Sequence, residues 1–444
     1  MSEDEICRRV TMKTLGCKVN SYESEQILQQ LVATGKWQPS GDVPSDLCII
    51  NSCTVTREAD RQTRQEIRRS IRDNPNARVV VTGCYAEMSA NEIAEIDGVD
   101  LIVGNAQKLK IPYLLPQMEL GELPKILSPE NLDDDLLAIP DPLLSGYSER
   151  TRAFLQIQQG CDQGCTFCII HQARGVSRSL PLEGIVKQAK KLHIGGFEEI
   201  VLCGVDLGSY GQDLSGPKPV NLVTLIHALL SIDAGFKIRI GSLDPIHISD
   251  ELLKLIALED RLSPHLHISI QSAHTLILKR MKRRYGSEHL YERVAMAHSL
   301  IDDLIIGADV MAGFPTEEDD HFMATLDSIH ELRIAFPHVF PYSERPGTPA
   351  ARIPRQVPKE IRSLRASRIR DAGRVVLSEE LGKRVGQTRN VLVEGSASKS
   401  GGARGRLTNY LPVSLNDPSL EAGSWVKARI TGHNGQTLDG ETVK

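Results

Sequence analysis

Three segments near the start of the chain share one pattern, a short apolar run that ends in cysteine. They are VTMKTLGC (10–17), DLCIINSC (46–53) and ARVVVTGC (77–84). Each is followed by a stretch with helical periodicity, so predicted strands and helices alternate along residues 9–110. This alternation predicts a parallel sheet with helices on its faces. Because the carboxyl ends of parallel strands face one crevice, Cys17, Cys53 and Cys84 are expected to meet there.

The middle of the chain repeats the alternation of strands and helices. Six apolar runs occur near FLQIQ, EIVLCG, KIRIGS, HLHISI, IIGADVMAGF and HVFPYS, within residues 150–350. Six such units predict a partial TIM-like α/β barrel. From residue 384, short alternating runs separated by Gly, Asn and Pro predict a small all-β barrel. We therefore expect domains at 1–117, 147–383 and 384–444, with an acidic linker at 118–146.

Cysteine content and charge limit the class of protein. Nine cysteines in 444 residues is a low density and an odd number, which favours a metal or redox role over a disulfide framework. The net charge of −5 includes a strongly acidic stretch at 119–150, which masks more basic ends. We find no signal-peptide pattern and no apolar run near the ~20 residues of a membrane span. We expect a cytoplasmic protein without membrane contact, and we favour a monomer.

The stretch GCDQGCTFC (160–168) directly follows the first strand of the predicted barrel, at the mouth where active sites lie. Its cysteines, Cys161, Cys165 and Cys168, favour zinc or an iron–sulfur cluster. Zinc would need a fourth ligand, and His171 is the candidate, although no second ligand pair follows at zinc-finger spacing. A cubane cluster held by three cysteines would leave one iron open to a small molecule.

The three-cysteine loop, with an aromatic residue before its last cysteine, resembles the signature of the radical S-adenosylmethionine (SAM) superfamily. ARG (173–175), GVDLGSYG (204–211) and DVMAGFPTE (309–317) are similar to other parts of that family. The resemblance implies a [4Fe–4S] cluster whose open iron binds SAM. Reductive cleavage of SAM then gives a 5′-deoxyadenosyl radical. It also implies cofactor contacts at Phe167, Arg174, Gly175, Gly204, Asp206 and Gly313.

Two sets of three cysteines, followed by a small β module, resemble the methylthiotransferase family over nearly the whole chain. The resemblance implies a methylthiotransferase domain, a radical SAM domain and an RNA-binding TRAM domain. It also implies a second [4Fe–4S] cluster on Cys17, Cys53 and Cys84, which holds the sulfur to be inserted. The resemblance further implies that both clusters take part in catalysis, that one SAM supplies the methyl group, and that an electron donor is required. Cys7, Cys48 and Cys203 are interpreted as small buried residues.

Two segments resemble the family branch that acts at C2 of N6-threonylcarbamoyladenosine, at position 37 beside the anticodon of tRNA. They are LGCKVNSYESE (15–25) and HVFPYSERPGTPA (338–350). The isopentenyladenosine branch more often has Gln-Met after the first cysteine, and the branch that modifies a ribosomal-protein aspartate has Pro-Lys-Asn. Both remain alternatives. The threonylcarbamoyl group carries a carboxylate, for which Arg283 or Arg174 is the candidate partner. His171 stands where the family usually has proline, so we expect a less rigid loop.

Rows of arginine and lysine suggest a nucleic-acid partner, here the anticodon stem-loop. Each row alone is equally typical of a solvated helix face, but three rows beside a β module favour phosphate contacts. Tyr410 and Trp425 are candidates for base stacking. A non-catalytic iron–sulfur protein that binds RNA is the rival interpretation. The rows are Arg57, Arg61, Arg64, Arg68 and Arg72; Arg362, Arg365 and Arg368; and LKRMKRRY at 278–285.

Overall fold

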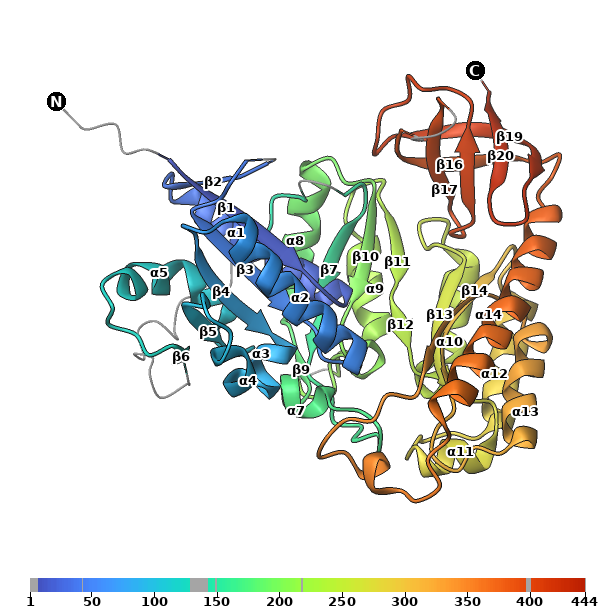
Figure 1. The fold of residues 1–444 in the computed structure, drawn as a ribbon. Coiled ribbons are helices and arrows are strands. Elements are labelled where there is room, and N and C mark those ends of the chain that lie inside the picture. Colours follow the sequence, from blue (N-terminus) through green and yellow to red (C-terminus); the bar gives the residue numbers. More distant parts are fainter. Residues whose placement is uncertain are drawn as a thin grey trace.

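The computed structural model describes residues 7–41, 43–127, 143–147, 150–216, 219–396 and 401–443. Its N-terminal part is a six-stranded, all-parallel sheet in the order β2-β1-β3-β4-β5-β6 (Figure 1). The strands are β1 (Arg8–Thr14), β2 (Trp37–Pro39), β3 (Leu47–Ser52), β4 (Arg78–Gly83), β5 (Leu101–Val103) and β6 (Ile126–Leu127). The helices are α1 (Lys18–Ala33), α2 (Arg57–Asp73), α3 (Cys84–Met88), α4 (Ala90–Ala94) and α5 (Ile111–Glu119).

Strand β3 shows why this sequence forms a sheet with two covered faces. Leu47 and Ile49 belong to an apolar cluster with α1 and α5, whereas Cys48 and Ile50 belong to a second cluster with α2 and α4. Successive side chains of a strand point to opposite faces, so a continuous apolar run suits a strand buried on both. The predicted parallel α/β domain is confirmed.

The N-terminal sheet extends beyond the boundary expected at residue 117. Strand β6 pairs with β5 through Ile126 and Leu127, inside the segment expected to be a linker. Two apolar residues are too few to give a periodic signal, which is why the strand was not predicted. Most of the acidic residues of that segment, from 128 to 142, lie outside the described residues.

The central domain is an open arc of parallel strands with helices on its outer side (Figure 1). Strands β7 (Ala153–Gln156), β10 (Glu199–Cys203) and β11 (Lys237–Ile240) form one sheet. After Gly241 the chain continues as β12 (Ser242–Leu243), which pairs with β13 (His265–Gln271), followed by β14 (Ile305–Ala312) and β15 (Ile334–Pro341). This arrangement confirms the predicted partial barrel.

Helices α8 to α14 complete the central domain, together with short α7 near the cysteine loop. Alternate residues of β14, namely Ile306, Ala308 and Val310, belong to the main apolar core. The residues between them, including Asp309, therefore lie on the opposite, concave face of the arc. The helices are α7 (Ile170–Arg174), α8 (Leu182–Ile194), α9 (Leu222–Leu230), α10 (Asp250–Leu258), α11 (Thr275–Arg280), α12 (Ser287–Leu300), α13 (Asp319–Glu331) and α14 (Lys359–Gly382).

The C-terminal domain follows α14 and is a closed five-stranded barrel in the order β16-β17-β18-β20-β19. Its strands are β16 (Thr388–Ser396), β17 (Ala403–Leu407), β18 (Pro412–Leu415), β19 (Trp425–His433) and β20 (Leu438–Thr442). The predicted all-β barrel is confirmed. In Figure 1 this barrel and the N-terminal domain lie at opposite ends of the central arc. No helix among the described residues is long and apolar enough to span a membrane.

Candidate functional site: two cysteine sites joined by an arginine

The three-cysteine loop of the central domain begins just after β7. It lies between β8 (Gln158–Gln159) and β9 (Arg178–Ser179), which pair antiparallel and close the base of the loop. Gly160 has a φ of 73°, and a Cβ there would lie 1.9 Å from the carbonyl oxygen of Val176. Only glycine fits this close approach of the two ends of the loop.

Each of the three loop sulfurs accepts a hydrogen bond from nitrogen. The donors are the backbone N–H of Gln163 for Cys161 (3.4 Å), the backbone N–H of Ile170 for Cys168 (3.4 Å) and Nη1 of Arg283 for Cys165 (3.4 Å). Such N–H donors stabilise thiolates that ligate iron and tune the potential of the cluster. Burial raises the pKa of the Cys161 thiol to about 12 and that of Cys168 to about 11. These thiols therefore ionise when a metal binds, which suits ligands better than free nucleophiles.

Two predicted cofactor residues, Asp206 and Phe167, support the loop itself, and their contact with SAM stays a prediction. Asp206 is buried, and its Oδ2 accepts hydrogen bonds from Nε2 of Gln163 (2.8 Å) and Oγ of Ser209 (2.7 Å), 4.0 Å from the Cys161 sulfur. Phe167 packs edge-on against Phe314, with ring centroids 6.4 Å apart. Both side chains fix the cysteine loop to the barrel.

The predicted cofactor glycines have packing reasons in the structure. Gly313 has a φ of 76°, and a Cβ there would lie 2.2 Å from Cγ of Arg362. A Cβ on Gly204 would lie 3.0 Å from Oε1 of Gln158, and Gly175, with a φ of 72°, ends α7. A direct role of these glycines in SAM binding stays a prediction.

His171 has a backbone N–H where the family's usual proline has none. This N–H is close enough to the Cys168 sulfur to lower the pKa of that thiol, against the larger opposite effect of burial. The expectation of a less rigid loop stays a prediction. Within the described residues no group of three His, Cys, Asp or Glu side chains is arranged to hold a single metal ion, the two cysteine sites included. The zinc alternative with His171 stays untested.

The second set of cysteines lies at the carboxyl edge of the N-terminal sheet. Cys17 caps α1, Cys53 follows β3, and Cys84 begins α3 after β4. Gly16 permits their approach, because a Cβ on it would lie 2.8 Å from Cβ and 2.9 Å from Sγ of Cys53. Burial, with smaller contributions from Cys84 and Cys17, raises the pKa of Cys53 to about 12. The structure thus brings together three cysteines that are far apart in sequence.

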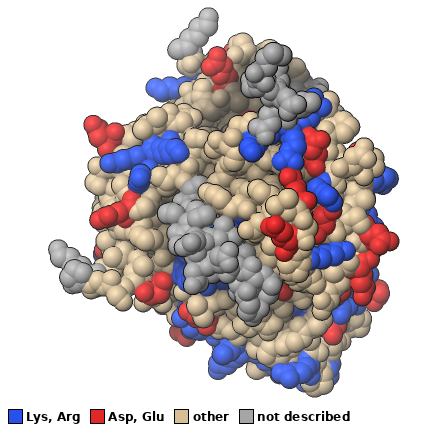
Figure 2. Space-filling model, turned by 90° about the vertical axis from the view of Figure 1, so that its left-hand side faces the viewer, with Lys and Arg blue, Asp and Glu red and all other residues tan. Residues whose placement is uncertain are grey.

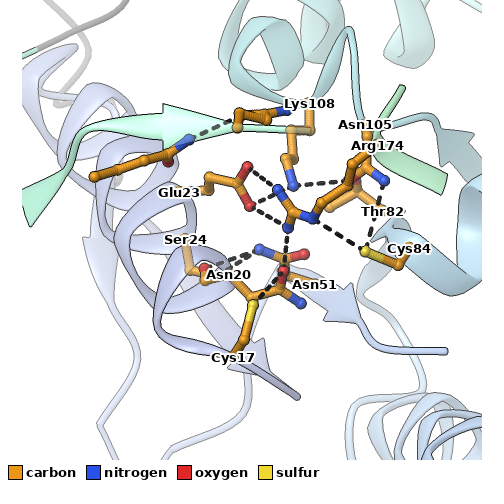
Figure 3. Close-up of polar contacts among 12 residues, drawn as sticks. Cys17, Asn20, Glu23, Ser24, Asn51, Thr82, Cys84, Asn105, Lys108 and Arg174 are labelled. Atoms are coloured by element: carbon orange, nitrogen blue, oxygen red, sulfur yellow. Dashed lines mark hydrogen bonds and ion pairs between the residues drawn. The ribbon is translucent and has the colours of Figure 1, made fainter. Parts of the chain in front are cut away.

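Arg174 reaches from the central domain into this second site (Figure 3). Its Nε lies 3.3 Å from Sγ of Cys84, and its Nη1 and Nη2 bind the two carboxylate oxygens of Glu23 at 2.9 and 3.0 Å. Nη2 also donates to Oδ1 of Asn20. The guanidinium is 1% exposed. Arg174 is therefore an interdomain residue, whereas the sequence predicted that it contacts SAM or the substrate.

Two further buried residues complete the network around Arg174. Lys108 donates to Glu23 and, at 2.8 Å, to Oδ1 of Asn105. Asn105 Nδ2 donates to the carbonyl oxygen of Ala173 (2.6 Å) and lies 3.7 Å from the sulfur of Cys84 (Figure 3). Burial alone would raise the pKa of Glu23, but Arg174 and Lys108 lower it below its usual value, so Glu23 is an anion between two cations.

A second interdomain contact flanks the same edge. Arg345, in the segment after β15, donates from Nη1 to Oδ2 of Asp60 at 2.6 Å and from Nη2 to Oγ1 of Thr54 at 2.7 Å. Thr54 follows Cys53 directly. Arg345 and Asp60 were not predicted, although Arg345 lies within the quoted stretch HVFPYSERPGTPA and Asp60 lies between two of the predicted arginines of α2.

Neither arginine proposed for the threonylcarbamoyl carboxylate is free to bind it. Arg174 is occupied by Glu23, and Nη2 of Arg283 binds Oδ2 of Asp244 at 2.6 Å. The side chain of Arg283 is 7% exposed. Both expectations are corrected because each guanidinium already has a buried carboxylate partner.

Much of the predicted basic surface is engaged within the protein. Arg365 is buried against Glu317 (2.8 Å) and Asp319 (2.6 Å), and Arg362 binds the carbonyl oxygen of Tyr342. In Figure 2, which views the left side of Figure 1, coloured basic and acidic side chains are interspersed. The expectation of three phosphate-binding rows is therefore wrong for Arg362 and Arg365. Helical spacing identifies a shared face but not what covers it.

Tyr410 packs against side chains of the central domain. Its ring lies under the guanidinium groups of Arg406, Arg239 and Arg152, at 4.1, 4.9 and 5.6 Å from the ring centroid. It also contacts His265, with ring centroids 5.1 Å apart. Tyr410 thus connects the C-terminal barrel to the central arc, and its predicted role in base stacking is untested. Trp425 is half-buried at the start of β19, and its predicted role is untested.

Comparison with known families agrees with this architecture. Residues 155–329 match the radical SAM superfamily model, residues 382–443 the TRAM domain, and residues 9–104 the uncharacterised protein family UPF0004. A solved radical SAM methyltransferase, TsrM from Kitasatospora setae, covers 78% of this chain and 75% of its own at 13% identity and a TM-score of 0.54. That likeness concerns the fold alone. Together, the fold and the cysteine loop define a radical SAM protein with an additional N-terminal domain.

Curated relatives give the finer family. The threonylcarbamoyladenosine tRNA methylthiotransferase MtaB of Rickettsia prowazekii is 38% identical over 96% of this chain and 95% of its own. MtaB of Bacillus subtilis is 39% identical over 84% and 81%. The tRNA-2-methylthio-N(6)-dimethylallyladenosine synthase of Aquifex aeolicus is 30% identical over 99% of each chain. This chain belongs to the radical SAM methylthiotransferase family.

Proposed function

We propose that the chain inserts a methylthio group at C2 of N6-threonylcarbamoyladenosine at position 37 of tRNA, with the anticodon stem-loop as substrate. The observation that carries this proposal is the similarity to MtaB proteins, whose names specify threonylcarbamoyladenosine. Five of these are 31–39% identical, whereas three synthases named for dimethylallyladenosine are 30–31% identical.

The residues present fit two iron–sulfur clusters. The loop sulfurs have one N–H donor each, and the second site has three cysteines beside two buried cations, which suits an anionic cluster. Cys161, Cys165 and Cys168 would hold the cluster that binds SAM, and Cys17, Cys53 and Cys84 the other. When bound, these groups supply the radical and the sulfur that an unactivated adenine C2–H requires. A protein partner or small molecule must donate the electron.

The protein's own residues hold these groups in place and shape the space between them. Gln163, Asp206 and Phe167 fix the first cysteine loop, and Arg283 donates to Cys165 while Asp244 holds it. These contacts are made by buried or partly buried side chains, so they orient the loop without competition from water.

The concave face of the barrel is polar, which also favours a polar substrate. Asp309 accepts from Nδ1 of His338 at 2.8 Å, and His267 Nε2 lies 3.2 Å from the same oxygen. Ser242 and Ser269 contact Asp309 at 3.2 and 3.3 Å. A threonylcarbamoyl group has hydroxyl, amide and carboxylate atoms to bind such a surface, whereas an isopentenyl group has none.

The substrate is tested with two tRNAs, one bearing threonylcarbamoyladenosine and one bearing isopentenyladenosine. Each is supplied to the anaerobically reconstituted protein with reductant, sulfide and SAM, and nucleosides are analysed by mass spectrometry. We expect a 2-methylthio product from the first tRNA only. Product from the second alone would assign the chain to the neighbouring branch. Product from neither, without SAM cleavage, would favour a non-catalytic RNA-binding protein.

The roles of the two cysteine sites are tested separately. Replacing Cys161, Cys165 and Cys168 by Ala should halve an iron content of about eight per chain and abolish 5′-deoxyadenosine formation. Replacing Cys17, Cys53 and Cys84 by Ala should leave SAM cleavage intact and stop sulfur insertion. Normal yield of methylthio product from the second variant would contradict the assignment of the N-terminal site.

A further inference from the structure

Arg174 connects the two cysteine sites. It lies six positions after Cys168, at the end of α7, and its Nε contacts Sγ of Cys84 in the other domain. The backbone of α7 is held at the same point, because Asn105 donates to the carbonyl oxygen of Ala173 at 2.6 Å. A movement of one cysteine loop would therefore shift a contact to the other.

The surroundings make Arg174 more than a packing residue. Its guanidinium is held by both oxygens of Glu23, a fork geometry that fixes its orientation and directs Nε at the sulfur (Figure 3). Glu23 also accepts from Lys108, so two cations share one anion in a region where all three side chains are at most 2% exposed. The surplus of positive charge lies beside Cys84.

We propose that Arg174 is a positioning residue contributed by the radical SAM domain, which orients Cys84 and makes the N-terminal cluster easier to reduce. This inference rests on the proposed function, because it requires a cluster on Cys17, Cys53 and Cys84. A charged donor to a ligand sulfur stabilises the added electron. The radical SAM domain thereby influences the chemistry of a cluster that it does not ligate.

The test isolates the N-terminal cluster in the full-length chain. Cys161, Cys165 and Cys168 are replaced by Ala, the protein is reconstituted anaerobically, and the midpoint potential is measured by a redox titration followed by EPR. Arg174→Gln is then added to this parent. We expect the reduction equilibrium constant to fall at least tenfold, which for a one-electron couple is about 59 mV. We take tenfold as the lower bound because the hydrogen bond from Arg174 to the Cys84 sulfur is charge-assisted, and such bonds are stronger than neutral ones.

Arg345→Gln in the same parent is the matched control. It removes another buried interdomain arginine, which binds Asp60 and Thr54 but contacts no cysteine sulfur in the described structure. We expect its potential to equal that of the parent. Equal shifts in both variants, or no shift in Arg174→Gln, would overturn the proposal and leave Arg174 as a structural contact.

A third variant keeps the test decisive if Arg174→Gln binds iron poorly. Arg174→Lys retains the positive charge but cannot reproduce the fork on Glu23 and the Nε contact together. We expect it to bind iron with a potential between those of the parent and Arg174→Gln. A potential equal to the parent's would show that orientation through Nε is unimportant. If the parent itself binds no iron, the second cluster of the proposed function fails, which is distinct from a failure of Arg174 alone.

Discussion

Asp60→Asn tests whether the N-terminal and radical SAM domains are held together by buried ion pairs. Asp60 on α2 binds Arg345 at 2.6 Å, and the two side chains are only 12% and 6% exposed. Asparagine has nearly the same shape but leaves the guanidinium without a counter-charge. Removing one partner of a buried pair costs about 3–5 kcal/mol.

The expected size of the effect can be converted to a melting temperature. At about 2 °C per kcal/mol, the lower value for large cooperative units, 3 kcal/mol corresponds to a decrease of roughly 6 °C. Differential scanning calorimetry of the apo protein measures it. The control is Glu58→Gln, on the same helix, because Glu58 pairs with Arg61 in an exposed position and should have no measurable effect. Equal melting temperatures for the two variants would refute the interdomain pair.

Four further predictions concern single substitutions. Lys18→Gln, which introduces the residue typical of the isopentenyladenosine branch beside the first cysteine, should raise KM for threonylcarbamoyladenosine tRNA about tenfold at constant iron content. The expectation is that the exposed ammonium of Lys18 binds the substrate carboxylate. His171→Pro should lower the potential of the SAM-binding cluster in redox titrations, because proline removes the backbone N–H that lowers the pKa of the Cys168 thiol. Tyr410→Ala should give the TRAM domain a separate, earlier calorimetric transition, because about 0.5–2 kcal/mol per cation–π contact is lost. Burial would raise the pKa of Glu380, but three cations lower it to about 2. The ionised Glu380 therefore stabilises the fold above pH 4.5, and this stabilisation is lost as the pH falls toward 2. The loss of stability on acidification should be smaller in Glu380→Gln. These cations are Lys383, Arg333 and Arg384.

The fold could be predicted because its elements carry local signals. Apolar runs such as 47–50 and 79–81 are long enough to indicate strands buried on both faces, and helical periodicity follows each of them. Strand β6 was missed because Ile126 and Leu127 alone carry no period. The same alternation predicts that Cys17, Cys53 and Cys84 lie close together, because parallel strands place their carboxyl ends at one edge of the sheet.

The partners of the arginines could not be predicted, for a physical reason. Arg174 and Glu23 are 151 positions apart, and Arg345 and Asp60 are 285 apart. Spacing along a helix shows which side chains share a face, but burial of that face depends on which domain packs against it. Arg365, predicted to contact phosphate, instead lies between Glu317 and Asp319 for this reason.

The two buried ion pairs between the N-terminal and radical SAM domains share a direction that bears on how the enzyme is assembled. In both, the radical SAM domain supplies the arginine, and the N-terminal domain supplies the carboxylate. The exposed pair of Arg57 and Glu344 has the opposite direction. In separated domains, Glu23 and Asp60 would lose their arginine partners, and Cys84 would lose its contact with Arg174. Docking of the domains therefore completes the polar surroundings of those cysteines. It follows that the N-terminal cysteines acquire their final environment only when the radical SAM domain is in place.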